Sequence, residues 1–172
     1  MITIRSAREN DLPGILGIYN DVILHTTAVY AYHPHTLEMR RAWYESKVKD
    51  GYPLFVADDG VRVVGLSTYG PFRAWPAYKY TVENSVYVAA DQRGKGIARM
   101  LMQPLIEAAR RQDVHAVIAS IDSTNEASLR LHRSLGFEEV AHFREVGYKF
   151  GRWLDLKFLE LLLETPATPV EG

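Results

Sequence analysis

The 172-residue sequence contains no cysteine. Disulfides, thiolate metal sites and a cysteine nucleophile are therefore excluded, and the absence fits a reducing compartment, so we expect a cytoplasmic protein. No run of about 18 apolar residues is present, and the N-terminus has no apolar signal region, so we expect neither a membrane span nor a secretory signal. The six histidines do not cluster at metal-ligand spacing, so we expect no metal site.

The sequence also lacks an excess of charge of either sign. Its net charge is −1, so it has no electrostatic footprint for nucleic acid or for an anionic membrane. The composition, 47% hydrophobic and 24% charged, is that of an ordinary globular protein. We expect a single domain over residues 1–164 and a frayed, proline-containing tail over residues 165–172.

A strand, a glycine-rich loop and a helix are predicted in succession between residues 85 and 109. Residues 85–89 alternate β-branched and aromatic side chains, as a strand does, whereas residues 91–96 are polar and contain two glycines. From Ile97 the apolar residues recur at helical spacing. We expect Pro104 to kink this helix or to break it, because proline lacks the N–H that would bond to the Met100 carbonyl.

This loop has the properties of a phosphate-binding site. The first turn of a helix has unpaired N–H groups and a partial positive charge, and Gly94 and Gly96 lack a Cβ that would keep a ligand from the backbone. Arg93, Lys95 and Arg99 add positive charge. The pattern matches neither a Walker A loop nor the Rossmann fingerprint, so a plain structural turn is the alternative to a pyrophosphate site.

The predicted elements follow the order β-α-α-β-β-β-α-β-α-β-β along the chain. We expect strands over residues 2–5, 53–57, 61–69, 80–89, 114–121, 138–146 and 153–163, and helices that start near residues 11, 36, 97 and 125. Asn10 or Asp11, Thr36, and Thr124 or Asn125 are the expected helix caps. This order predicts an α/β fold with a mixed sheet of six or seven strands and helices on both faces.

Two side chains could carry proton transfer. Glu83 lies among apolar residues of the predicted strand, where it is either a solvent-facing charge at a sheet edge or a general base for an attacking amine. His132 lies on the last predicted helix, where it is either a packed histidine or a proton carrier near neutral pH.

Two further positions could contact ligands. Arg73 is flanked by Phe72 and Trp75 in a proline-bounded loop, where it is either solvated or a bidentate clamp for a carboxylate. Asn125 is either a simple helix cap or a residue that also bonds a cofactor amide.

Several segments resemble one enzyme family. The run Arg93-x-x-Gly96-x-Ala98 resembles the acetyl-CoA pyrophosphate loop of the GNAT superfamily of N-acetyltransferases, and residues 125–137 resemble a second segment of that family. His132 stands where the family often has a tyrosine that protonates the departing thiolate. That histidine, and the runs over residues 19–28, 81–88 and 146–156, resemble the subgroup that acetylates phosphinothricin and methionine sulfoximine or sulfone.

The resemblance implies a GNAT fold and a role for each matching position. It implies that Glu83, directly or through water, takes the amine proton, that His132 assists, and that the Val88 N–H polarises the thioester carbonyl. It implies binding of acetyl-CoA as co-substrate by Val86, Tyr87, Val88, Arg93, Gly94, Lys95, Gly96, Ile97, Ala98, Arg99, Asn125 and Ser128. It implies binding of the amino acid by Arg73, Ala74, Trp75, Glu83, Asn84 and Ser85.

We therefore expect direct transfer of an acetyl group from acetyl-CoA to the α-amino group of a small amino acid analogue. Tyr30 stands where relatives often have tryptophan, which leaves the identity of the acceptor open. The alternatives are acetylation of a protein N-terminus or a polyamine, and a non-catalytic CoA-binding module. The resemblance also implies a homodimer, with residues 150–153 and the apolar last strand as the contact surface.

Overall fold

The structure is a computed structural model that describes residues 1–171. Its strands are β1 (Thr3–Ser6), β2 (Leu54–Asp58), β3 (Val63–Pro71), β4 (Thr81–Val88), β5 (Ala116–Asp122), β6 (Glu138–Lys149) and β7 (Arg152–Leu162). Its α-helices are α1 (Leu12–His25), α2 (Leu37–Lys49), α3 (Ile97–Arg111) and α4 (Glu126–Ser134). Short 3-10 turns are η1 (Glu9–Asp11), η2 (Pro76–Tyr78) and η3 (Ala90–Gln92).

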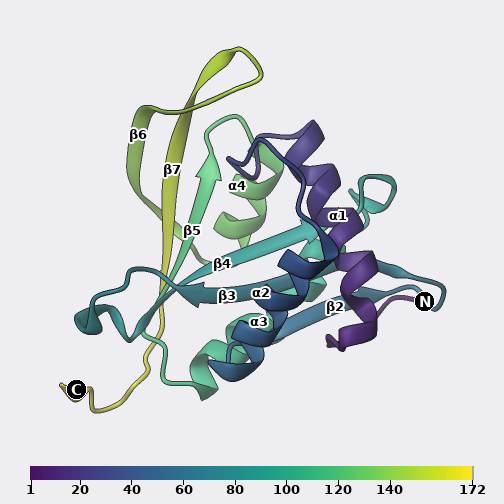
Figure 1. Cartoon of the computed structure of the whole chain (residues 1–172). Coiled ribbons are helices and arrows are strands. Elements are labelled where there is room, and N and C mark those ends of the chain that lie inside the picture. Colours follow the sequence, from purple (N-terminus) through teal and green to yellow (C-terminus); the bar gives the residue numbers. More distant parts are fainter. Residues whose placement is uncertain (172) are drawn as a thin grey trace. The chain divides into compact units, whose positions relative to one another are not determined.

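The strands form one mixed sheet in the order β1-β2-β3-β4-β5-β7-β6 (Figure 1). β4 and β5 are parallel, whereas β1–β2, β2–β3, β5–β7 and β6–β7 are antiparallel. The predicted α/β fold with a mixed sheet is therefore confirmed, with seven strands.

The chain falls into two compact units, which we describe separately. The first unit comprises Met1–Tyr69 and Ser85–Leu105, and the second comprises Gly70–Asn84 and the chain from Ile106 onward. The boundary divides β4 after Asn84, so this one continuous strand belongs to both units.

Two hydrophobic clusters cover opposite sides of the strands in the first unit. Ile15 of α1 packs in one cluster with Val56 of β2, and Trp43 of α2 packs against that cluster. Ala57, the next residue of β2, belongs to the other cluster with Ile97 of α3. Successive strand residues point to opposite faces, so α1 and α2 cover one face of these strands and α3 covers the other.

Two of the predicted helix caps are confirmed. The Thr36 hydroxyl accepts a hydrogen bond from the Met39 N–H at 3.2 Å, and Asn125 Oδ1 accepts one from the Ser128 N–H at 3.1 Å. The Asp11 residue occupies the cap position of α1, but its side chain makes no capping bond there.

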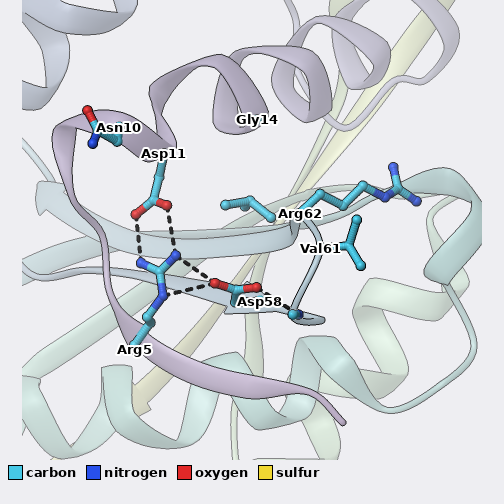
Figure 2. A pocket seen from close by; sticks show the side chains of 9 residues that line it. Arg5, Asn10, Asp11, Gly14, Asp58, Val61 and Arg62 are labelled. Atoms are coloured by element: carbon cyan, nitrogen blue, oxygen red, sulfur yellow. Dashed lines mark hydrogen bonds and ion pairs between the residues drawn. The ribbon is translucent and has the colours of Figure 1, made fainter.

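The Asp11 carboxylate is instead part of an ion-pair network in the first unit. Figure 2 shows the Arg5 guanidinium between Asp11 and Asp58, with contacts of 2.7 and 2.8 Å to Asp11 and 2.8 Å to Asp58. These hydrogen bonds from Arg5 lower the pKa of Asp11. The network ties β1 to β2 and to the start of α1, beside a surface pocket that also contains Gly14 and Arg62.

Helix α3 continues through Pro104, which excludes the expected alternative of a break, whereas a kink there stays a prediction. Proline has no N–H to donate to the Met100 carbonyl, four residues earlier, and its ring crowds that carbonyl. The buried Ser67 hydroxyl of β3 donates a hydrogen bond to the Leu101 carbonyl at 2.9 Å. This bond from outside the helix stabilises the turn before Pro104.

In the second unit, β7 lies between β5 and β6 and pairs with both. The C-terminal segment is attached at two points. Thr165 donates to the Val114 carbonyl, and the Tyr80 hydroxyl exchanges hydrogen bonds with both backbone groups of Val170, at 3.0 and 3.1 Å. The single domain over residues 1–164 and the fraying of residues 165–172 stay predictions.

Candidate functional site

The connection from β4 to α3 has the predicted strand–loop–helix form. The Ala89 N–H donates to the Val64 carbonyl at 2.9 Å and holds the end of β4 beside β3. After the η3 turn, Gly94 and Gly96 have φ values of +76° and +77°, and α3 begins at Ile97. L-residues rarely adopt such values, so the two glycines are required by the path of the backbone.

The glycine loop is open on its outer side. A Cβ placed on Gly94 or on Gly96 would meet no atom within 4 Å, and residues 93–96 are all exposed. The N–H groups at the start of α3 therefore lie beside an accessible backbone. This arrangement fits a diphosphate, which needs several N–H donors and close approach to the main chain.

Cationic side chains are held at the edge of this loop. Arg93 Nε donates to the Val88 carbonyl at 3.2 Å, and its guanidinium lies 3.6 Å from the Asp21 carboxylate of α1. Lys95 Nζ donates to Gln92 Oε1 at 2.9 Å. Sequence reasoning missed the ion pair with Asp21, although Asp21 lies in a run that carried the family resemblance.

The last residues of β4 are fixed by packing on both sides of the strand. Val86 and Val88 pack against the cluster that contains Ile97. The Tyr87 ring meets the Tyr19 ring of α1 edge to face, with centroids 5.6 Å apart. The backbone that leads into the loop is therefore rigidly placed within the first unit.

Glu83 lies in the second unit, where β4 pairs with β5 opposite Ile118. Along β4 the burial alternates: Val82 and Asn84 are buried, whereas Thr81, Glu83 and Ser85 are half-buried. The Glu83 carboxylate therefore projects from the more accessible face of the strand, opposite to Asn84.

His132 is almost completely buried, with 2% of its surface exposed. Its Nε2 lies 3.0 Å from Asn84 Nδ2, and its Nδ1 lies 2.9 Å from the Ser128 carbonyl oxygen. The Phe137 ring packs edge-on against the imidazole at a centroid distance of 5.0 Å. Burial lowers the pKa of His132, and the hydrogen bond to Ser128 partly opposes that effect.

The predicted loop for the amino acid is exposed and is anchored by aromatic rings. The Arg73 guanidinium stacks 4.0 Å from the centre of the Phe72 ring and donates to the Phe72 carbonyl at 2.8 Å. Phe72 in turn meets Tyr78 and Phe158 edge to face. Within residues 1–171 Arg73 pairs with no carboxylate, and 75% of Trp75 is exposed.

The structure groups the predicted site residues by unit. The second unit holds Arg73, Ala74, Trp75, Glu83, Asn84, Asn125, Ser128 and His132, and the first unit holds Ser85 and the residues predicted for the cofactor from Val86 to Arg99. Among the predicted residues of the second unit, hydrogen bonds link His132 to Asn84 and to Ser128, and link Asn125 to Ser128. Strand β4 connects the two sets covalently.

Within residues 1–171 no group of three or more histidine, aspartate or glutamate side chains is arranged to hold a metal ion. No helix in this part of the chain combines the length and the apolar character that crossing a membrane requires.

The mixed seven-stranded sheet with a glycine loop at the start of α3 has the fold of solved acetyltransferase structures, with a TM-score of 0.96 to one of them. The family model described as "Acetyltransferase (GNAT) domain" matches residues 4–157. The chain belongs to this family.

Two named relatives and a solved structure match nearly the full length of the chain. An L-methionine sulfoximine/L-methionine sulfone acetyltransferase of Pseudomonas aeruginosa is 49% identical over 94% of this chain and 95% of that protein. A phosphinothricin N-acetyltransferase of Streptomyces coelicolor is 40% identical over 92% and 95%. The structure of an acetyltransferase of Salmonella typhimurium with its cofactor acetyl-CoA has a TM-score of 0.96 and 43% identity, covering 99% of both chains.

Proposed function

We propose that this enzyme acetylates the α-amino group of a small amino acid of the methionine sulfone, methionine sulfoximine or phosphinothricin type, with acetyl-CoA as the acetyl donor. The observation that carries the proposal is the 49% identity, over almost the whole of both chains, to an acetyltransferase named for the first two substrates. The accessible glycine loop at the start of α3 supports the use of a diphosphate-containing donor.

Acetyl-CoA is the co-substrate, and the first unit supplies most of its proposed contacts. The N–H groups of the loop bind the pyrophosphate, with charge from the side chains of Arg93, Lys95 and Arg99. The strand residues Val86–Val88 pair with the pantetheine arm, and the Val88 N–H polarises the thioester carbonyl. The remaining proposed contacts are Gly94, Gly96, Ile97, Ala98, Asn125 and Ser128.

Glu83 and His132 are the proposed catalytic pair. An ammonium group has no lone pair, so the amino acid must lose a proton before its nitrogen attacks the thioester carbonyl. Glu83 takes that proton, directly or through one water, and His132 assists. A C–N bond then forms, the C–S bond breaks, and CoA leaves as a thiolate, which takes up the second proton that the attacking nitrogen loses as it becomes an amide. The chain has no cysteine, so an acyl-cysteine intermediate is excluded.

The loop before β4 favours a substrate that carries a carboxylate. Arg73 is exposed and pairs with no carboxylate within residues 1–171, so its guanidinium is available for bidentate binding. Ala74, Trp75 and Ser85 frame the rest of the amino acid, whereas the Asn84 side chain, also predicted for this role, is buried and bonds to His132. A polyamine would require acidic side chains where this loop offers Arg73, which disfavours that alternative.

We propose that the enzyme works as a cytoplasmic homodimer. β6 is one of the two edge strands of the sheet, and large apolar side chains of β6, β7 and their connection are exposed: Val140, Phe143, Val146, Tyr148, Phe150, Trp153 and Leu162. An exposed edge of this length with so much apolar surface is typical of an interface. Light scattering that gives the mass of one chain would contradict the dimer.

A thiol-release assay tests the proposed activity. The purified enzyme is incubated with acetyl-CoA and one amine at a time: methionine sulfone, methionine sulfoximine, phosphinothricin, spermidine, or a short peptide with a free N-terminus. We expect CoA release with the first three and little with the last two. Faster release with spermidine or the peptide would overturn the assigned substrate class, and no release with any amine, despite CoA binding, would favour a binding module.

A further inference from the structure

The hydrogen bonds of His132 determine which of its nitrogens carries the proton. The Ser128 carbonyl oxygen can only accept a hydrogen bond, so Nδ1, at 2.9 Å, must be the donor. A neutral imidazole has one N–H, which leaves Nε2 as an acceptor. Nε2 lies 3.0 Å from the Asn84 amide nitrogen, which donates to it.

The alternative, an imidazolium, does not fit this environment. A cation would need an acceptor at Nε2 as well as at Nδ1, whereas the group that lies at hydrogen-bond distance from Nε2, at 3.0 Å, is the Asn84 amide nitrogen. Within residues 1–171 no carboxylate forms an ion pair with His132, which is 2% exposed. Burial without a counter-charge favours the neutral ring.

Glu83 and His132 are on different sides of β4. Neighbouring strand residues project to opposite faces, and the alternating burial of Val82, Glu83 and Asn84 follows this rule. Asn84 points toward His132, so the Glu83 carboxylate points away from it. The two proposed catalytic residues are therefore joined through the backbone and side chain of Asn84, and not by a direct hydrogen bond.

We propose that Asn84 is a positioning residue that holds His132 as the neutral tautomer with its proton on Nδ1. This inference rests on the proposed function and specifies how His132 assists. The Ser128 carbonyl, the imidazole and the Asn84 amide form one directed chain of hydrogen bonds that ends on β4 next to Glu83, and each bond polarises the next. In this state the Nε2 lone pair accepts the Asn84 N–H, and the ring has no proton at Nε2 to give to the departing thiolate.

Histidine ring nitrogens can be observed directly by NMR. In long-range 1H–15N spectra of the full-length, 15N-labelled enzyme near neutral pH, we expect a protonated Nδ1 and a non-protonated Nε2 for His132, assigned with His132→Gln. A protonated Nε2, with or without a proton on Nδ1, would overturn the proposal. This measurement does not depend on which amine is acetylated, so its failure is separate from a failure of the proposed function.

Variants of Asn84 then test positioning. In Asn84→Asp a carboxylate faces Nε2 of His132, so we expect Nε2 to become protonated. In Asn84→Ala we expect kcat to fall about tenfold, with the KM for acetyl-CoA unchanged. Val82→Ala is the control, because Val82 is a buried residue on the same face of β4, 3% exposed, that makes no hydrogen bond to His132. If the 15N signals of the His132 ring and kcat were the same in the Asn84→Ala and Val82→Ala variants, Asn84 would be only a packing residue.

Discussion

The loop before α3 and the buried Asn84–His132 pair obtain their geometry in different ways. The loop is shaped by its backbone: Gly94 and Gly96 have positive φ, and residues 93–96 are exposed. The pair is shaped by side chains that are 8% and 2% exposed and that hydrogen-bond each other. Substitutions in the loop should therefore change affinity through backbone strain, whereas substitutions around the pair should change turnover.

The largest effect is expected for Glu83→Gln. The amide cannot take the amine proton, so we expect kcat to fall by roughly 10²–10³-fold with the affinity for acetyl-CoA almost unchanged. Steady-state kinetics with methionine sulfone and calorimetric titration with acetyl-CoA measure the two quantities.

Glu160→Gln is the matched control for Glu83→Gln. Both glutamates lie opposite Ile118 of β5, Glu83 on the parallel side and Glu160 on the antiparallel side. The control removes one negative charge from β7, on the other side of β5 from β4, and should keep nearly full turnover. Wild-type turnover in Glu83→Gln would remove Glu83 from the mechanism and leave proton transfer without an assigned base.

A smaller and different effect is expected for Arg73→Ala. Loss of a charged hydrogen-bond partner costs about 1.5–3 kcal/mol, so the KM for methionine sulfone should rise by roughly 10–100-fold while the KM for acetyl-CoA stays the same. Lys79→Ala removes a cation from the same connection, where its ammonium lies 5.1 Å from the centre of the Tyr80 ring, and should change neither constant. An unchanged KM for methionine sulfone in Arg73→Ala would refute the carboxylate clamp.

The contrast between loop and pair also explains what the sequence could predict. The strand–glycine–helix succession depends on local rules, so the path of residues 85–97 and the caps at Thr36 and Asn125 were predictable. The partner of His132 depends on which residue of a distant strand faces α4, and no local pattern contains that information. The same reason applies to Ser67, which lies 34 positions before its partner Leu101 in α3 and stabilises the turn before Pro104.

Asp11→Asn should lower stability without affecting catalysis. The Asp11 side chain is 10% exposed and accepts two hydrogen bonds from Arg5, so we expect a loss of about 1–2 kcal/mol in the free energy of unfolding at neutral pH. Arg5 lowers the folded-state pKa of Asp11 below its ordinary value of 3.8. The unfolded chain therefore takes up the Asp11 proton first, and the stabilisation is present above pH 3.8 and declines as the pH falls below it.

Urea unfolding at several pH values measures this effect. The difference between wild type and Asp11→Asn should be largest near neutral pH and should shrink in acid, while kcat measured at neutral pH stays equal in the two proteins. A difference that is constant from neutral pH down to acid would show that the Arg5 ion pair does not cause it.

The smallest expected effects come from one substitution made at two glycines. Gly96 has φ +77°, where an alanine costs about 1 kcal/mol. Gly96→Ala should therefore lower the free energy of unfolding by about that amount and weaken the affinity for CoA several-fold. Gly17 lies on the exposed side of α1, where a Cβ meets no atom within 4 Å, so Gly17→Ala should raise stability by about 0.5–1 kcal/mol. The added methyl group is the same and open space surrounds it at both sites. Stability changes of opposite sign in the two variants would therefore identify backbone conformation as the cause. Equal CoA affinity in the two variants, measured by calorimetry, would contradict a diphosphate site built from the N–H groups of this loop.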